Sequence, residues 1–222
     1  MWIKICGVRD PDTAVAVCRY RPQAIGLNFY AKSPRYVHPE VAQQIIQSLP
    51  SQIESVGLFV NMPPDQIGVC CRDCRIDTAQ LHGDETPQEV EQLHRANPDL
   101  NLIRAFRVGP DNLDEVANWL TESRDRKIPL KACLLDARSD SAYGGTGQTA
   151  PWSLINQAYR RDTWPPLVLA GGLTPDNVQS AIRDVQPWGI DVASGVESGP
   201  GTKDPQLLQR FMQAAHDAKL SD

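Results

Sequence analysis

The sequence of 222 residues predicts an α/β protein, a single (β/α)8 barrel domain spanning residues 1–222. Two observations carry this prediction: short, mainly apolar runs recur along the chain, and segments with helical spacing of apolar residues separate them. The runs are rich in Val, Ile, Leu and Phe, which is typical of strands buried on both faces of a parallel sheet. The eight runs are Trp2–Cys6, Ala24–Phe29, Ser55–Val60, Thr78–Leu81, Leu102–Phe106, Leu130–Leu135, Leu167–Ala170 and Ile190–Ala193.

Helix-like segments lie between the runs. In residues 41–49 and 207–211, apolar positions recur at spacings of three and four, as on one face of a helix. Several starts show an N-cap side chain before a proline, whose fixed φ suits the first helical position. The least regular segment lies between Asp111 and Leu120, because Asn112 and Asn118 fall within it. The predicted starts are Asp10-Pro11, Thr86-Pro87 (with Glu89 completing a capping box), Thr174-Pro175 and Asp204-Pro205.

A doubly wound open sheet of eight strands is the alternative architecture. Neither half of the chain has a Gly-x-Gly-x-x-Gly turn after its first strand, which weakens the dinucleotide-binding version of that fold. Eight strand–helix units in this length suit a barrel slightly under the usual ~250 residues. No internal linker divides the chain, so we expect one domain.

Composition excludes several functional classes. With 41% hydrophobic and 22% charged residues, the chain can bury a sizeable core. A net charge of −5 argues against a nucleic-acid partner, since phosphate neutralisation needs clustered Lys and Arg. No apolar run approaches the roughly 18 residues of a membrane span. Because the first strand begins at Trp2, no room is left for a targeting segment, and we expect a cytoplasmic protein.

The six cysteines predict free thiols rather than a disulfide framework, because the chain is long and carries no export signal. Cys71 and Cys74, with Cys70 beside them, could belong to a zinc site. Structural zinc needs four ligands and usually a second pair at matching spacing, which this sequence lacks. We favour the interpretation that these three cysteines lie at the end of a helix as thiols that bind no metal.

Two ionisable residues end strand-like runs. In a barrel, ligands and chemistry collect where strands end, so Cys6 and Asp136 should face one pocket. Cys6 could be a nucleophile or base if its pKa is lowered, or simply a small apolar plug. Asp136 follows apolar residues, where a carboxylate is costly unless it is hydrogen-bonded or functional. It could be a general acid if burial raises its pKa, or a loop-closing cap.

Glycine loops predict a site for an anion. Glycine lets backbone N–H groups approach phosphate closely, and barrels frequently hold phosphate after strands seven and eight. Arg35 offers a planar fork for a carboxylate or phosphate, although a loop arginine is often merely solvated. His82 closes the fourth run and could point into the pocket or be structural, and Asp191 lies at the rim. The candidate substrate-binding residues are Arg35, His82, Gly145, Gly147, Gly172, Ser194 and Gly195.

Taken together and in order, these motifs resemble those of the phosphoribosylanthranilate isomerase family over nearly the whole chain. Any one of them is a weak signal, but the ordered set is highly specific. The motifs are Lys4-Ile5-Cys6-Gly7, Ser33-Pro34-Arg35-Tyr36, Gly57-Leu58-Phe59-Val60-Asn61, Gln80-Leu81-His82-Gly83, Leu135-Asp136, Gly144-Gly145-Thr146-Gly147, Ala170-Gly171-Gly172-Leu173, the stretch from Asp191 to Glu197, and Gly201-Thr202-Lys203-Asp204.

The resemblance implies a (β/α)8 isomerase of tryptophan biosynthesis. Its reaction would be the Amadori rearrangement of N-(5-phosphoribosyl)anthranilate to 1-(2-carboxyphenylamino)-1-deoxyribulose 5-phosphate. It further implies Cys6 as general base, Asp136 as general acid, Arg35 facing the anthranilate carboxylate, and glycine loops holding phosphate. It implies no metal or organic cofactor. The expected partner is the phosphoribosyl substrate, with no nucleic acid and no membrane, and the chain would be a monomer or homodimer.

Other hypotheses stay open at this point. Another phosphosugar barrel, such as indole-glycerol-phosphate synthase, should place a lysine at a strand end, whereas Lys4 lies in mid-strand. The related isomerase of histidine biosynthesis has an aspartate at the position of Cys6, which places this chain on the tryptophan side. A non-catalytic binding protein would use the glycine loops only as turns.

Overall fold

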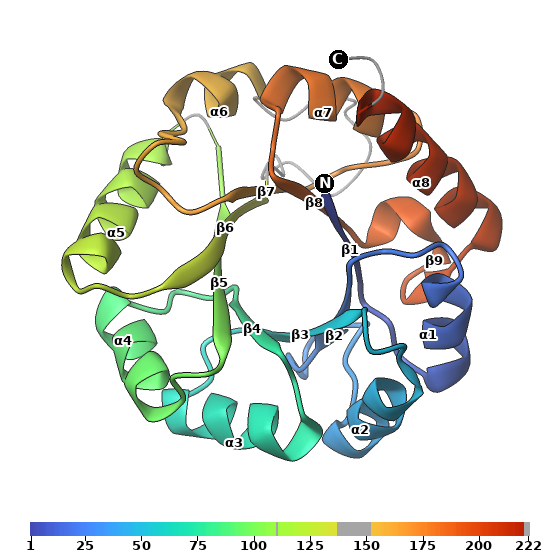
Figure 1. Ribbon diagram of the computed structural model, residues 1–222, viewed down its shortest axis with the longest axis horizontal. Helices are drawn as coiled ribbons and strands as arrows, with labels where there is room; N and C mark the ends of the chain where they lie inside the picture. Colours follow the sequence, from blue (N-terminus) through green and yellow to red (C-terminus); the bar gives the residue numbers. More distant parts are fainter. Residues whose placement is uncertain (110, 137–151, 220–222) are drawn as a thin grey trace.

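The structure, a computed structural model, describes residues 1–109, 111–136 and 152–219. Eight parallel strands close into a barrel in chain order, and the last strand pairs with the first. Figure 1 looks down the barrel axis and shows the helices as an outer ring around the strands. The predicted (β/α)8 barrel is confirmed.

The observed strands begin and end within one residue of the predicted runs. The barrel strands are β1 Trp2–Cys6, β2 Ala24–Asn28, β3 Glu54–Phe59, β4 Thr78–Leu81, β5 Asn101–Arg107, β6 Leu130–Asp136, β7 Leu167–Ala170 and β8 Gly189–Val192. The helices are α1 Pro11–Cys18, α2 Pro39–Ser48, α3 Pro64–Cys74, α4 Pro87–Ala96, α5 Leu113–Asp125, α6 Trp152–Ala158, α7 Val178–Val185 and α8 Pro205–Lys219.

Three of the four predicted helix starts are confirmed. Asp10 accepts a hydrogen bond from the backbone of Thr13 at 2.8 Å, and Thr86 forms a complete capping box with α4. Asp204 caps α8 by accepting from two backbone N–H groups of its first turn.

Two expectations about helix bounds are wrong. Helix α7 does not start at Pro175 but at Val178, because the Asn177 side chain accepts from the backbone of Thr174 at 2.8 Å and forms a separate turn first. Helix α5 continues beyond Leu120 to Asp125.

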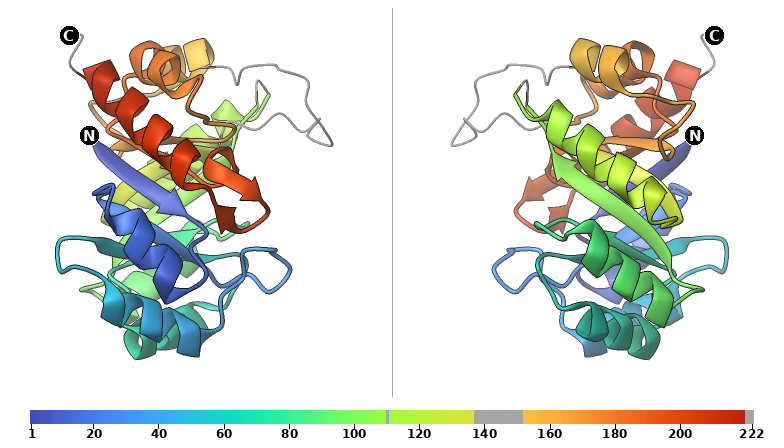
Figure 2. Two further views of the ribbon diagram at one scale, coloured as in Figure 1. Left: turned by 90° about the vertical axis from the view of Figure 1, so that its right-hand side faces the viewer. Right: turned by 90° about the vertical axis from the view of Figure 1, so that its left-hand side faces the viewer.

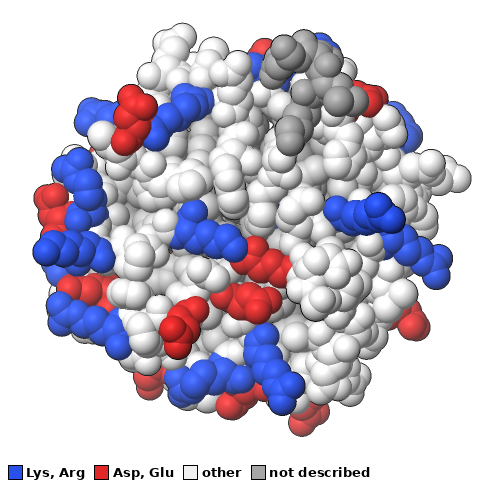
Figure 3. Space-filling view, viewed as in Figure 1, with Lys and Arg blue, Asp and Glu red and all other residues white. Residues whose placement is uncertain are grey.

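The barrel interior is packed rather than hollow. Inward-facing residues form a small apolar cluster of their own, and a larger cluster fills the layer between strands and helices. At the amino-terminal end, Glu54 accepts from the Trp2 indole at 3.2 Å and pairs with Lys131. Figure 3 views this end, where acidic and basic side chains alternate around the rim. The apolar interior cluster comprises Trp2, Ala24, Val56, Ile103, Ala105, Ala132, Leu134, Val168 and Ala170.

A short hairpin was not predicted from the sequence. After the 3₁₀ turn η1 (Ser194–Val196), strands β9 (Glu197–Gly199) and β10 (Thr202–Lys203) pair antiparallel. Figure 2 shows this hairpin at the end of the barrel opposite the N-terminus, which is the end where the strands finish. Within the described ranges, no helix has both the length and the apolar character needed to cross a membrane.

Candidate active site

A cavity of about 300 Å³ opens at the carboxyl ends of the strands. Its lining brings together side chains that are far apart in the sequence. Gly145 and Gly147, also predicted to bind substrate, lie outside the described residues. The predicted site residues that line the cavity are Cys6, Arg35, His82, Asp136, Gly172, Ser194 and Gly195.

Cys6 is the last residue of β1, and the residue is 5% exposed. It pairs in register with Gly26 on β2, where a β-carbon would lie 2.7 Å from the Cys6 sulfur. Gly26 therefore provides the space that the thiol occupies, a role that sequence reasoning missed. Gly7 follows with φ +81°, a conformation that favours glycine and lets the chain leave the strand. Burial raises the pKa of the Cys6 thiol, although the charge of Lys4 acts to lower it.

Lys4 and Asp191 form a buried ion pair below Cys6. The Lys4 Nζ lies 3.0 Å from the Asp191 Oδ2, and the Lys4 side chain has no exposed surface. Burial alone would lower the pKa of Lys4, but Asp191 and Cys6 outweigh it and raise that pKa. Sequence reasoning treated Lys4 only as a mid-strand residue. The alternation of side chains along a strand could have identified Lys4 as a site residue, since residues 4 and 6 of one strand face the same side.

Asp136 ends β6 and lies across the cavity with His82. The His82 Nε2 is 3.8 Å from the Asp136 Oδ2, while the Gln80 amide nitrogen is 3.3 Å from the other ring nitrogen. The loop that carries His82 is held from below by Arg104, whose guanidinium donates to the carbonyls of Leu81 and Gly83. The histidine and the carboxyl group thus face each other within one pocket.

Arg35 lies at another wall of the cavity, in the loop after β2. Its Nε donates to the Glu197 carboxylate at 2.9 Å and its Nη2 at 2.6 Å, a bidentate pair. Lys203 donates to the same carboxylate at 2.8 Å. Burial would raise the pKa of Glu197, but the hydrogen bonds from Arg35 and Lys203 outweigh it and hold that pKa below its usual value. The unpredicted hairpin therefore fixes the arginine at the cavity wall.

The loops after β7 and β8 supply the glycine-rich wall. Gly172 has φ +65°, which favours glycine. At Gly195 a β-carbon would lie 1.8 Å from the carbonyl oxygen of Leu173, so the two loops approach as closely as only glycine allows. Ser194 lies beside Gly195 on the same wall. Backbone N–H groups brought together in this way can bind an anion such as phosphate.

The cysteine cluster lies elsewhere, in the last turns of α3. Burial raises the pKa of Cys70 to about 12 and also raises those of Cys71 and Cys74. In the part of the chain that the structure describes, no three His, Cys, Asp or Glu residues are grouped so that they could hold a metal ion. None of these three cysteines lines the cavity that contains Cys6.

A closed barrel with a carboxyl group, a thiol and a glycine-rich wall in one cavity at its strand ends defines an enzyme of the (β/α)8 class. Comparison with known proteins identifies the family. The model of the family "N-(5'phosphoribosyl)anthranilate (PRA) isomerase" matches residues 3–214. The chain belongs to the PRA isomerase family, the isomerases of tryptophan biosynthesis.

Individual relatives agree with this assignment. The N-(5'-phosphoribosyl)anthranilate isomerase of Trichlorobacter lovleyi is 42% identical over 217 residues, covering 97% of this chain and 98% of the relative. The crystal structure of the Thermotoga maritima enzyme aligns with a TM-score of 0.85 and 35% identity, covering 98% and 99% of the two chains. A further PRA isomerase structure, in complex with reduced 1-(o-carboxyphenylamino)-1-deoxyribulose 5-phosphate, gives a TM-score of 0.83 at 32% identity and the same coverage.

Proposed function

We propose that this chain converts N-(5-phosphoribosyl)anthranilate to 1-(2-carboxyphenylamino)-1-deoxyribulose 5-phosphate by an Amadori rearrangement. Cys6 is the general base and Asp136 the general acid. Arg35 receives the anthranilate carboxylate, and the glycine wall at Gly172 and Gly195 receives the phosphate. A cytoplasmic location and a monomeric or homodimeric state belong to the same proposal.

The observation that carries the proposal is the shared cavity of Cys6 and Asp136. A thiol and a carboxyl group on different walls can act on different atoms of one pentose. The ligand of the related structure presents a carboxyphenyl group, a reduced deoxyribulose and a phosphate. The cavity offers an arginine for the first, an acid and a base for the second, and glycine loops for the third.

The chemistry needs one proton delivered and one removed. Asp136 in its acid form donates to the ring oxygen, so that the furanose opens and the exocyclic nitrogen forms a protonated Schiff base with C1. This cation acidifies the C2–H bond, and the Cys6 thiolate takes that proton to give an enolamine. The enolamine then tautomerises to the ketone and the two side chains return to their starting states, so the substrate is isomerised without any net gain or loss of protons.

Steady-state kinetics on two variants test the assignment. The fluorescence of the phosphoribosyl substrate is followed as it is consumed, and Cys6→Ser and Asp136→Asn should each lower kcat by about 10²–10⁴-fold. The melting temperature should change little, because both substitutions keep side-chain volume. Cys18→Ser, a substitution of a half-buried cysteine outside the cavity lining, is the matched control. Near-normal turnover in either cavity variant would remove the acid–base assignment.

Substrate choice is tested with the same enzyme. The phosphoribosyl amine of histidine biosynthesis undergoes the same rearrangement, so it serves as the competing substrate. We expect much the higher kcat/KM with the anthranilate-bearing substrate, whose carboxylate matches Arg35. Equal values for both substrates would contradict the substrate assignment while leaving the reaction type in place.

A further inference from the structure

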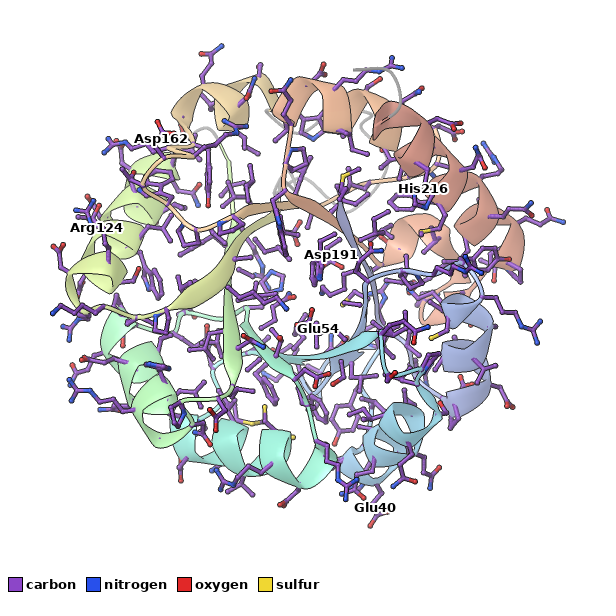
Figure 4. All side chains as sticks on the ribbon, in the orientation of Figure 1. Glu40, Glu54, Arg124, Asp162, Asp191 and His216 are labelled. Carbon is purple, nitrogen blue, oxygen red and sulfur yellow. The ribbon has the colours of Figure 1, made fainter. Side chains whose placement is uncertain are left out.

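The barrel interior contains a charge pair directly below the thiol of Cys6. Lys4 and Cys6 are two positions apart on β1 and face the same side, and Asp191 lies opposite Lys4 in register on β8. The Lys4 Nζ is 3.0 Å from the Asp191 Oδ2. Figure 4 shows Asp191 inside the ring of strands. The pair therefore lies between the packed interior and the reaction cavity.

Such a pair is a poor way to stabilise a barrel. Removing an ammonium and a carboxylate from water is costly, and well-packed apolar residues of similar volume often give equal or greater stability. Most of the other inward-facing positions of the barrel are apolar, among them Ile103, Ala132 and Val168. A fully buried lysine among such residues indicates a function that an apolar side chain could not supply.

The charges around Cys6 come from several elements. Lys4 on its own strand and Lys203 on β10 both act to lower the pKa of the thiol, while Asp191 on β8 acts to raise it. Among these charges Lys4 has the largest effect on Cys6. Among the described residues, the charged or titratable side chains that line the same cavity with Cys6 are Tyr30, Arg35, His82, Arg107, Asp136 and Asp191.

We propose that Lys4 is a positioning residue whose buried ammonium, fixed by Asp191, stabilises the thiolate of Cys6 in its role as base. This inference rests on the proposed function of Cys6. Lys4 does not touch the substrate, because it lies below the thiol and has no exposed surface. Asp191 holds the lysine charged and in place, so that the positive charge is directed at the sulfur.

The direct test measures the thiol without the reaction. Iodoacetamide alkylates the thiolate, so the rate of Cys6 alkylation against pH, read by mass spectrometry of the Cys6 peptide, gives a midpoint for that residue. In Lys4→Met the midpoint should rise by about one pH unit or more, because a nearby opposite charge is lost. A lysine with a merely structural role would change the maximal alkylation rate but not the midpoint.

A second variant keeps the test possible if Lys4→Met does not fold. Lys4→Met alone leaves Asp191 buried without its partner, which can destabilise the protein severely. Lys4→Met/Asp191→Asn removes both charges. Because Lys4 acts on Cys6 more strongly than Asp191 does, the midpoint should still rise, by less than in the single variant. An unchanged or lowered midpoint in a folded variant overturns the proposal.

The chain offers matched controls. Lys131 also forms an ion pair, with Glu54, which is partly exposed at the amino-terminal end of the barrel, away from Cys6. Figure 4 shows Glu54 within the same ring of strands. Lys131→Met should leave the Cys6 midpoint where it is, and Cys18 in every variant should keep its own alkylation profile. If Lys131→Met also shifted the Cys6 midpoint, loss of a lysine elsewhere in the barrel would have the same effect as loss of Lys4. That result would also overturn the proposal.

The alkylation result separates this inference from the proposed function. If the unmodified enzyme turns over the phosphoribosyl substrate but Lys4→Met leaves the midpoint unchanged, the role of Lys4 fails and the isomerase assignment stands. If the midpoint rises as expected but Cys6→Ser retains near-normal turnover, the influence of Lys4 on the thiol is real and the base assignment fails. With both intact, the alkaline rise of kcat/KM should move to higher pH in Lys4→Met by the same shift.

Discussion

The thiol of Cys6 fills the space where a side chain at position 26 would stand. A β-carbon on Gly26 would be 2.7 Å from the Cys6 Sγ and 3.0 Å from the Cys6 Cα. These two residues are direct neighbours on adjacent strands. Glycine at position 26 therefore decides where the proposed base can lie, although it carries no chemistry of its own.

Gly26→Ala should consequently damage activity more than stability. The added methyl group forces the sulfur to move, and a displacement of about 1 Å in a reacting group can cost about 10²-fold in rate. We expect kcat to fall by about one to two orders of magnitude, measured by loss of substrate fluorescence. Gly199→Ala is the matched control, since a β-carbon there meets nothing within 4 Å. Full activity in Gly26→Ala would mean that the thiol position is not critical.

Arg35 and Glu197 should act together on substrate binding. Arg35→Ala should raise KM for the phosphoribosyl substrate, by about tenfold or more, because a charge-assisted pair to its carboxylate is lost. Glu197→Gln should raise KM less, since it leaves the guanidinium present but less firmly held. In the double variant the effects should not add, because both act through one contact. An unchanged KM in Arg35→Ala would show that the carboxylate is bound elsewhere.

Glu197 also predicts an acid-dependent contribution to stability. Its pKa is held below the ordinary value of 4.5, so its ionised form stabilises the fold above that pH and the contribution is lost as pH falls through the lower, folded value. The melting temperature of the unmodified protein should exceed that of Glu197→Gln at pH 7, and the difference should shrink below about pH 4.5. A constant difference down to pH 2 would contradict a lowered pKa for the Glu197 carboxylate.

The pH dependence of turnover should reflect the buried thiol. Because burial raises the pKa of Cys6, only a small fraction is thiolate at neutral pH, and that fraction grows as pH rises towards the pKa. On this limb kcat/KM should increase by up to about tenfold per pH unit above pH 7. Rates measured across pH 6–10 with a buffer of constant ionic strength provide the check. A flat profile over this range would argue against thiol deprotonation as the step that limits kcat/KM.

Arg104 should contribute strongly to stability. Its guanidinium lies 3.2 Å from the buried Glu85 carboxylate, donates to backbone carbonyls around His82, and stacks on the Phe106 ring at 4.5 Å. Arg104→Leu leaves the buried Glu85 carboxylate without its cationic partner, with only the backbone N–H groups of Asn61 and Gly83 donating to it. Removing one partner of a buried pair typically costs about 3–5 kcal/mol. Urea denaturation measures this loss. The exposed pair of Arg210 and Asp176 gives the control, because Arg210→Ala should change stability little.

The sequence by itself determined the strand order, the barrel and the candidate acid and base. Each mainly apolar run could become a strand because its residues suit burial on both faces, and the strands end within one residue of the runs. Cys6 and Asp136 could be selected because each ends such a run, and strand ends in a barrel meet at one opening. The helix starts at Asp10, Thr86 and Asp204 followed from local capping chemistry alone.

Only the tertiary structure decided which side chains surround these groups. Three relationships each join residues that are far apart in the chain. Gly26 leaves room for the Cys6 thiol, Lys4 forms an ion pair with Asp191, and Glu197 forms an ion pair with Arg35. Strand register and barrel closure fix these distances, and no local pattern encodes them. The start of α7 was predicted wrongly for a related reason. Thr174-Pro175 has the pattern of a helix start, but the Asn177 side chain accepts a hydrogen bond from the Thr174 backbone and the helix begins at Val178. Local sequence does not determine which of these two arrangements forms.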